Sequence, residues 1–353
     1  MTDQLRHVHA WLRDAPTFAV GEPPAGMLRL DLNEGAYGPT PKALAALEAA
    51  GPNLNRYPDP NGAHGLRDAL AERLDVAPDA LLFGAGSNSV QSLMIRLAAG
   101  PGKKVAYSWP GFPTFGWAAS RCGAEPLPVP TRADGSDDLD ALAAAAREAS
   151  VVVLATPNNP TGRVVTEGLE AWVADVARHA LVLLDEAYHE YAPPRVTGLD
   201  LFHAGHDVVV LRTFSKAWGL AGARIGYGIM APELRAVARS AQDTFEVSAA
   251  TFEAARASLD DADVVAARMV ENARVRAALE AHFASLGADC WPSAANFVCA
   301  KPPDPDAFAA RLAEHRILVR PTVQFGAPDR VRVGVPAEAD LERLLAAITD
   351  ALT

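Results

Sequence analysis

Short apolar runs alternate with helix-like segments through the middle of the chain, and this alternation restricts the fold more than any other feature. Strands are expected at residues 80–83, 104–108, 126–129, 151–155, 208–211 and in the run that ends at Asp185, with helices such as 139–149 and 167–179 between them. Such alternation favours an α/β layer architecture with a largely parallel sheet. In sheets of this kind, ligands bind at the carboxyl ends of the strands.

Lys216 follows one of these strands directly, within the stretch RTFSKAWGLAGARIGY that begins at Arg212. Thr213 and Ser215 flank it, and Arg224 stands two helical turns further along if the stretch is helical. A nearby like charge lowers the proton affinity of a lysine, which makes it a better amine nucleophile. An isolated loop lysine is usually a surface group, but this one is placed to form a Schiff base beside phosphate-binding side chains, as pyridoxal phosphate requires.

A glycine-rich turn, GAGSNSVQSLMIRLA from Gly84, enters the helix expected after the strand at 80–83. Free backbone N–H groups and the positive end of a helix dipole make such a turn an anion site. The turn matches the dinucleotide fingerprint only in part, because Ser89 occupies the third glycine position. A nicotinamide-dependent oxidoreductase is therefore a weaker alternative, and it leaves the surroundings of Lys216 unexplained.

The length of 353 residues and the hydrophobic fraction of 50% suffice for one large core and a second, smaller one. A mostly helical stretch follows Pro232, and short strands are then expected at 296–300, 317–320 and 330–335, before a final helix at 341–352. We therefore expect an N-terminal arm at 1–35 that joins the small domain, a large cofactor-binding domain at 36–240 and a small α+β domain at 241–353.

The formal net charge of −11 argues against a nucleic acid or an anionic membrane as partner. Cys122, Cys290 and Cys299 lack CxxC spacing, so neither a disulfide framework nor a zinc site is expected. His203 and His206 have no evident third ligand, and no metal is expected there either. The N-terminal residues resemble no signal peptide and no run approaches a membrane span, so we expect a cytoplasmic protein.

Four separated motifs, GAGSNS, TPNNPTG, DEAY and SKAWGLAGAR, occur in this order, together with LNEGAYGP, RYPDPNG and VRVGVP. This set resembles the fold-type I pyridoxal-phosphate aminotransferases, and within them the histidinol-phosphate aminotransferase branch. The resemblance covers nearly the whole chain. It implies a large domain with a mostly parallel sheet flanked by helices, a smaller α+β domain, a homodimer, and transfer of an amino group from a small-molecule donor to a 2-oxo acid.

By this resemblance, Lys216 is the lysine that forms the Schiff base and later moves the proton at the substrate Cα. Asp185 is the partner of the pyridine nitrogen, which it keeps protonated so that the ring withdraws electrons. Tyr188 and Asn159 are the hydrogen-bond partners of the 3′ oxygen. Phe112 is the ring that stacks on the pyridine.

The resemblance also implies a phosphate site and a substrate site. The cofactor phosphate would be held by Gly86, Ser87, Asn88, Thr213, Ser215 and Arg224. Tyr57 would reach the phosphate of the neighbouring subunit's cofactor, which implies active sites shared across a homodimer. Arg332 would bind the anionic end of the substrate, with Arg320 and Asn33 as further substrate contacts.

Histidinol phosphate is the first candidate for the amino donor, with 2-oxoglutarate as acceptor. Relatives usually carry a tyrosine near the N-terminus whose hydroxyl meets the substrate phosphate, whereas this chain has Phe18 in that region. An aromatic amino-acid aminotransferase, a threonine-phosphate decarboxylase and an enzyme of specialised metabolism with the same fold are therefore alternatives. An effector-sensing module of a transcription regulator would carry a helix-turn-helix extension, and the N-terminal arm is too short for one.

Overall fold

A seven-stranded sheet organises the larger part of this computed structural model, which describes residues 3–13, 17, 24–59 and 63–353. Its strands, in spatial order, are β2 (Leu81–Gly84), β8 (Gly226–Ile229), β7 (Val209–Thr213), β6 (Leu181–Asp185), β5 (Val151–Ala155), β3 (Lys104–Trp109) and β4 (Glu125–Pro130). β8 runs antiparallel to both β2 and β7, and the remaining pairs are parallel. The strands expected between residues 80 and 211 lie within one or two residues of these bounds.

β8 was not among the expected strands, because its glycines hide the strand pattern. The stretch from Lys216 to Arg224 that precedes β8 forms turns, so the expectation that Arg224 follows on a helix is wrong. A side chain at Gly226 would place its Cβ 2.2 Å from the backbone nitrogen of Ser87. Glycine is therefore required where β8 passes the start of the next helix.

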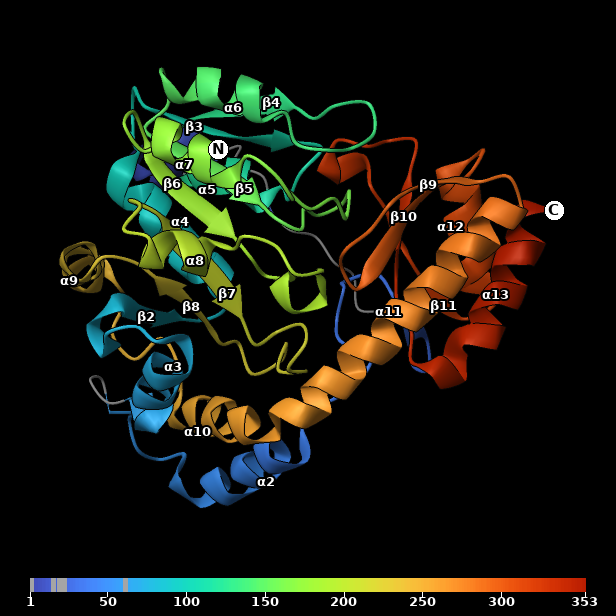
Figure 1. Cartoon of the computed structure of the whole chain (residues 1–353), viewed down its shortest axis with the longest axis horizontal. Coiled ribbons are helices and arrows are strands. Elements are labelled where there is room, and N and C mark those ends of the chain that lie inside the picture. The colour runs from blue at the N-terminus through green and yellow to red at the C-terminus, as the bar shows by residue number, and fades with distance from the viewer. Residues whose placement is uncertain (1–2, 14–16, 18–23, 60–62) are drawn as a thin grey trace.

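Helices cover both faces of this sheet (Figure 1). On one face lie α6 (Leu139–Ala146), α7 (Leu169–Val176) and α8 (Gly198–His203), and on the other lie α4 (Ser87–Ala98), α5 (Thr114–Arg121) and α9 (Pro232–Ala241). Leu154 and Leu184 enter the first core, while their neighbours Val153 and Leu183 enter the second. Successive side chains of a strand point to opposite faces, so these fully buried strands serve both cores.

A third group of helices packs below the β2 edge of the sheet in Figure 1: α2 (Pro41–Ala50), α3 (Leu66–Leu74) and α10 (Ala249–Ser258). Thr40 caps α2 and Ser248 caps α10, each by accepting a hydrogen bond from a backbone N–H of the first turn. α10 packs against α2, and its Phe252 belongs to the core of the large part. The domain boundary expected at residue 240 stays a prediction, and α10 lies beyond it.

The smaller part has a four-stranded sheet in the order β12 (Arg320–Pro321), β13 (Val331–Gly334), β10 (Phe297–Lys301) and β9 (Asp289–Trp291). These strands pair antiparallel and pack against α11 (Ala262–Ser285), α12 (Pro305–Glu314) and α13 (Glu338–Leu352). α11 runs from the large part into the small one (Figure 1). The expected C-terminal strands correspond to β10, β13 and the two short strands β11 and β12, whereas β9 was not expected.

Residues 28–30 of the N-terminal segment lie with the small part. β1 (Leu28–Arg29) pairs in parallel with β11 (Ile317–Leu318), and Leu30 enters the small core. α1 (Ala10–Arg13) contacts α5 instead. Short 3-10 turns complete the chain: η1 (Asp3–His7), η2 (Gly51–Asn53), η3 (Ala63–Gly65), η4 (Pro78–Ala80), η5 (His189–Tyr191), η6 (Leu259–Asp261) and η7 (Val323–Phe325). Phe18 and the end of the RYPDPNG loop, residues 60–62, lie outside the described residues.

Within the described ranges, none of the helices combines the length and the apolar character needed to cross a membrane.

Candidate active site

A cavity of about 340 Å³ opens at the carboxyl ends of β5, β6 and β7, where the large part faces the small part. Its lining includes most of the residues singled out from the sequence: Ser87, Asn88, Phe112, Asn159, Asp185, Tyr188, Thr213, Ser215, Lys216, Arg224 and Arg332. Parallel strands bring their carboxyl ends to one edge of the sheet, so residues far apart in the sequence meet there. The cavity is therefore the candidate site.

Lys216 extends into this cavity from the turn after β7. Its Nζ donates a hydrogen bond to the backbone oxygen of Leu32 at 3.1 Å and lies 5.7 Å from the centre of the Tyr188 ring. Burial and the nearby guanidinium of Arg332 lower the pKa of Lys216 to about 7. A lysine that loses its proton near neutral pH is a competent amine nucleophile.

Asp185 ends β6, and its carboxylate faces the cavity although the residue is only 8% exposed. It accepts a hydrogen bond from the backbone N–H of Ala187 at 3.0 Å. Burial raises the pKa of Asp185 to about 6. The carboxylate is still ionised at neutral pH, as a partner for a protonated ring nitrogen must be.

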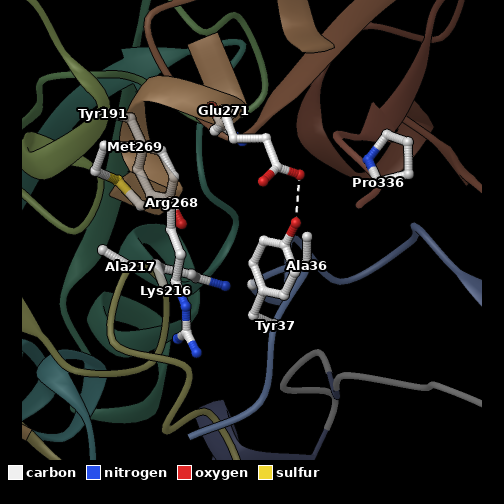
Figure 2. A pocket seen from close by; sticks show the side chains of 11 residues that line it. Ala36, Tyr37, Tyr191, Lys216, Ala217, Arg268, Met269, Glu271 and Pro336 are labelled. Carbon is white, nitrogen blue, oxygen red and sulfur yellow. Dashed lines mark hydrogen bonds between the residues drawn. The ribbon is translucent and has the colours of Figure 1, made fainter. Parts of the chain in front are cut away.

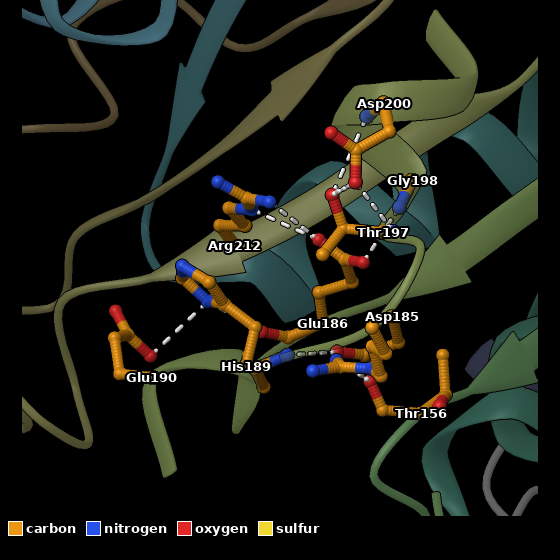
Figure 3. A network of polar contacts seen from close by, with 11 residues as sticks. Thr156, Asp185, Glu186, His189, Glu190, Thr197, Gly198, Asp200 and Arg212 are labelled. Carbon is orange, nitrogen blue, oxygen red and sulfur yellow. Dashed lines mark hydrogen bonds and ion pairs between the residues drawn. The ribbon is translucent and has the colours of Figure 1, made fainter. Parts of the chain in front are cut away.

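Glu186 follows Asp185 and lies on the other side of the sheet, where Figure 3 shows its network. Arg212 donates to its Oε2 from Nε at 2.9 Å and from Nη2 at 2.7 Å, and the backbone N–H of Gly198 donates to Oε1 at 2.7 Å. A buried carboxylate is tolerated only when it is paired and hydrogen-bonded in this way. The pair fixes the chain immediately after Asp185.

An anion cradle lies at the first turn of α4. Gly86 precedes this helix with φ of +86°, and a Cβ there would approach Nη2 of Arg224 to 2.6 Å. Arg224 itself is exposed, has φ of 57° and donates to the backbone oxygens of Ala85 at 3.1 Å and Ala221 at 2.9 Å. The backbone N–H of Ser87 and the guanidinium of Arg224 therefore lie close together, as an anion site at a helix N-terminus requires.

Hydroxyl groups complete the cradle. Thr213 donates from Oγ1 to Oγ of Ser215 at 3.0 Å, and both residues line the cavity together with Asn88. The side-chain oxygen of Asn88 is buried and has no partner among the described residues. Rotation of the amide would present its NH2 group in place of this oxygen, so Asn88 can donate a hydrogen bond to an anion in the cradle. The cavity size, the donors of the cradle and Asp185 opposite it fit pyridoxal 5′-phosphate.

Arg332 reaches the cavity from β13 and is 3% exposed. It donates from Nη1 to Oδ1 of Asn159 and from Nη2 to the backbone oxygen of Asp31, both at 2.6 Å, whereas its Nε is buried without a partner in the described part of the chain. The ring of Phe325 lies 4.8 Å from the guanidinium carbon. A buried guanidinium on a cavity wall is a binding group for a carboxylate or phosphate.

The structure places four of the expected site residues outside the cavity lining. Asn33 is buried, and its side-chain N–H donates a hydrogen bond to the hydroxyl of Tyr188 at 3.0 Å, so it holds the position of that hydroxyl. Arg320 lies opposite Arg332 in the β12–β13 pairing and donates to Gln324 at 3.4 Å. Gly86 lies directly before the lining residue Ser87. Tyr57 is 80% exposed, away from the cavity of its own chain.

Known proteins share this sequence pattern and this architecture. The family model for aminotransferase class I and II matches residues 25–348. The chain belongs to this aminotransferase family. A histidinol-phosphate aminotransferase 2 from Pseudomonas fluorescens is 37% identical over 93% of this chain and 90% of its own length. An aromatic amino acid aminotransferase from Mycolicibacterium smegmatis is 38% identical, over 94% of this chain and 92% of its own length.

Among solved structures, the histidinol-phosphate aminotransferase from Sinorhizobium meliloti in complex with pyridoxal-5′-phosphate superimposes with a TM-score of 0.84. It is 32% identical and covers 92% of this chain and 90% of its own. The expected family, the fold-type I architecture and the dependence on pyridoxal phosphate are confirmed. The protein is a pyridoxal-phosphate-dependent aminotransferase.

The aminotransferase cavity also contains residues that the sequence did not single out for it, chiefly Phe325, Phe115 and Leu32. Phe325 stands in the loop PTVQFGAP between β12 and β13. Phe325 is a large aromatic residue among turn-forming residues, and this is the signal in the sequence that could have indicated it. Together with Phe112, these rings give the cavity an aromatic wall.

On the far side of Lys216, the aminotransferase has a second cavity of about 20 Å³ (Figure 2). The hydroxyl of Tyr37 donates to Oε1 of Glu271 there, and Arg268 donates to the backbone oxygen of Gly38 at 3.0 Å. Gly35 lines the same cavity, and a Cβ at this residue would approach the backbone oxygen of Lys216 to 2.7 Å. The loop 35–38 therefore holds the turn that carries Lys216.

Proposed function

We propose that this aminotransferase takes its amino group from a donor with one anionic group and an aromatic ring, with L-histidinol phosphate as the first candidate and 2-oxoglutarate as acceptor. Arg332 carries this proposal, because it is a buried guanidinium on the wall of the cavity that contains Lys216. A planar guanidinium suits a phosphate or a carboxylate equally well. The aromatic wall formed by Phe112, Phe115 and Phe325 suits the ring.

The residues of the cavity take the following roles in this proposal. Bound pyridoxal phosphate supplies an electron-withdrawing ring that makes the substrate Cα proton acidic. Lys216, with its lowered pKa, would act as the base that takes the proton from the substrate Cα. Asp185 would keep the proton on the ring nitrogen, and Tyr188 and Asn159 would donate hydrogen bonds to the 3′ oxygen. Ser87, Thr213, Ser215 and Arg224 hold the phosphate group.

Histidinol phosphate and the aromatic amino acids both offer an anion and a ring, and the named relatives include aminotransferases for each. The relatives named for histidinol phosphate and the Sinorhizobium structure support the first donor. The second donor is favoured by the cavity itself, since Arg332 is the one guanidinium among its described lining residues besides Arg224 of the cradle. A carboxylate needs fewer donors than a phosphate dianion does.

A single-turnover absorbance scan of the holoenzyme separates the two donors. We expect histidinol phosphate to convert the bound cofactor to its amino form faster than phenylalanine at equal concentration. Rapid conversion by phenylalanine alone would assign the enzyme to aromatic amino acids instead. If neither donor changes the absorbance of the bound cofactor, the proposal is rejected in favour of a specialised substrate. If the enzyme releases carbon dioxide from a phosphorylated amino acid, it is rejected in favour of a decarboxylase.

We also propose a cytoplasmic homodimer. Tyr57 is 80% exposed and stacks on Phe245 at 4.6 Å between ring centroids, and Phe245 is itself 43% exposed. An exposed pair of stacked aromatic rings is suited to a contact between copies of the chain, from which Tyr57 can reach a neighbouring site. Sedimentation of the wild type and of Tyr57→Ala tests the dimer, and a monomeric wild type refutes it.

Fractionation of the source cells tests the cytoplasmic location, and recovery of the protein outside the cytoplasm refutes it.

A further inference from the structure

A groove of about 470 Å³ lies apart from the active site, where the large part meets α11 and the segment between β9 and β10. Its lining contains Arg163 from the loop after β5, Arg276 from α11, and the hydroxyl residues Thr166 and Ser293. No carboxylate side chain is among the described residues that line it. None of these residues has a place in the aminotransferase site described above.

Both arginines lie next to the contact between the loop after β5 and the segment that joins β9 to β10. The backbone N–H of Ala294 donates to the oxygen of Gly162 at 2.8 Å, which joins the loop after β5 to the small part. At Gly162, which has φ of 73°, a Cβ would lie 2.4 Å from Oγ of Ser293, so the two chain segments are in close contact. Arg163 directly follows this glycine. Arg276 donates from Nη1 to the backbone oxygen of Ala295, one residue beyond this contact, at 2.9 Å.

The positive charge in the groove is only partly compensated. Arg276 makes no ion pair within the described ranges of the chain, and Glu280, one turn further along α11, accepts from the backbone N–H of Ser293 at 3.1 Å. Arg163 pairs through Nη2 with Asp134 at 3.0 Å, but its Nε is buried without an acceptor among the residues that the structure describes.

Ser293 adds a donor to this arrangement. Its Oγ accepts a hydrogen bond from the backbone N–H of Ala295 at 3.2 Å, which leaves the hydroxyl proton free to donate. Guanidinium and hydroxyl donors are the groups that bind phosphates and carboxylates, and here the neighbouring carboxylates of Asp134 and Glu280 offset only part of the charge.

We propose that this groove binds a small oxyanion, an inorganic or organic phosphate or a carboxylate, at the junction of the two parts. Arg276 and Arg163 bind the anion from the small-part side and the large-part side respectively. Because the ligand contacts both parts, it stabilises their present arrangement. The site is separate from Arg332, so the anion does not compete directly with the amino donor for that guanidinium.

Calorimetric titration of the holoenzyme with inorganic phosphate tests this site. Arg276→Met removes one guanidinium, and we expect it to weaken the phosphate affinity of the groove about tenfold or more. Arg163→Met, on a different element, is expected to do the same. Arg178→Met is the matched control, because Arg178 is an exposed arginine that pairs with Asp175 outside the groove.

Arg332→Met separates the groove from the active site, since anion binding at Arg332 is lost in that variant while binding in the groove is retained. The proposal is overturned if Arg276→Met and Arg163→Met both titrate like the wild type, or if Arg332→Met binds no phosphate at all. A thermal melt of each holoenzyme shows whether the variants are folded. Titration with succinate in place of phosphate distinguishes the ligands: binding of both anions indicates a general oxyanion site, and binding of phosphate alone a phosphate site.

Discussion

Nη1 of Arg332 donates a hydrogen bond of 2.6 Å to Oδ1 of Asn159. Arg332 stands on β13 of the small part, and Asn159 stands in the loop after β5 of the large part. The bond therefore links the residue proposed to bind the donor with a residue proposed to contact the cofactor. Any group that binds Arg332 also acts on Asn159 through this contact.

Arg332→Lys keeps the positive charge but loses the planar fork of donors. We expect the KM for the amino donor to rise about 10-fold to 100-fold, because hydrogen bonds to charged groups contribute about 1.5 to 3 kcal/mol. Steady-state kinetics measure this change. Arg330→Lys is the control, since Arg330 is also buried but pairs with Asp289 and stacks on Trp291 outside the cavity. An equal rise in KM for both variants would contradict the role of Arg332.

Asp185→Asn replaces the carboxylate that faces the cavity by a neutral group of the same size. We expect the cofactor to remain bound, while the single-turnover rate falls about 100-fold or more, because an amide does not stabilise a protonated ring nitrogen. The surface variant Asp175→Asn should keep the wild-type rate. Near-normal turnover in Asp185→Asn would remove this residue from the mechanism.

Lys216→Ala should abolish transamination and also change how the stability of the cofactor-free protein depends on pH. The folded lysine has a pKa of about 7 against an ordinary value of 10.5, so the unfolded chain binds more protons between these two pH values. The contribution of Lys216 to the free energy of unfolding is therefore lowest below a pH of about 7, and it increases as the pH rises toward about 10.

Urea unfolding of the cofactor-free wild type and of Lys216→Ala at several pH values measures this effect. The difference in midpoint between the two proteins should move in favour of the wild type as the pH rises. Parallel curves over the whole range would show that burial does not lower the pKa of Lys216.

Gly35→Ala should disturb the active site through the backbone of Lys216. The added Cβ would lie 2.7 Å from the oxygen of Lys216, so the turn must shift. We expect a loss of about 1 to 3 kcal/mol in unfolding free energy together with a lower kcat. Gly38→Ala, in the same loop, meets no described atom within 4 Å and should stay within about 0.5 kcal/mol of the wild type. Equal effects of the two substitutions would argue against the contact with Lys216.

Continuous apolar runs predicted the central parallel strands of the large sheet, such as β5 and β6, because nearly all residues of these strands are buried. Such runs did not predict β8, because the sequence GYGI contains two glycines and the pairing of this strand depends on β2 and β7 rather than on its own residues. The turns after Lys216 were not predicted either, because Arg224 adopts a left-handed backbone conformation with a φ of 57° that the local sequence does not predict.

Sequence alone determined that this protein is an aminotransferase and predicted its candidate site, because the motifs around Asn159, Asp185 and Lys216 follow strands whose ends must meet at one edge of the sheet. Only the tertiary structure decided which arginine reaches the cavity: Arg332 lines it, whereas Arg320 on the neighbouring strand does not. It also decided that Asn33 supports Tyr188 and that Phe325 lies over Arg332. These relations join residues far apart in the chain, so they depend on how the two parts pack and leave no periodic signal in the sequence.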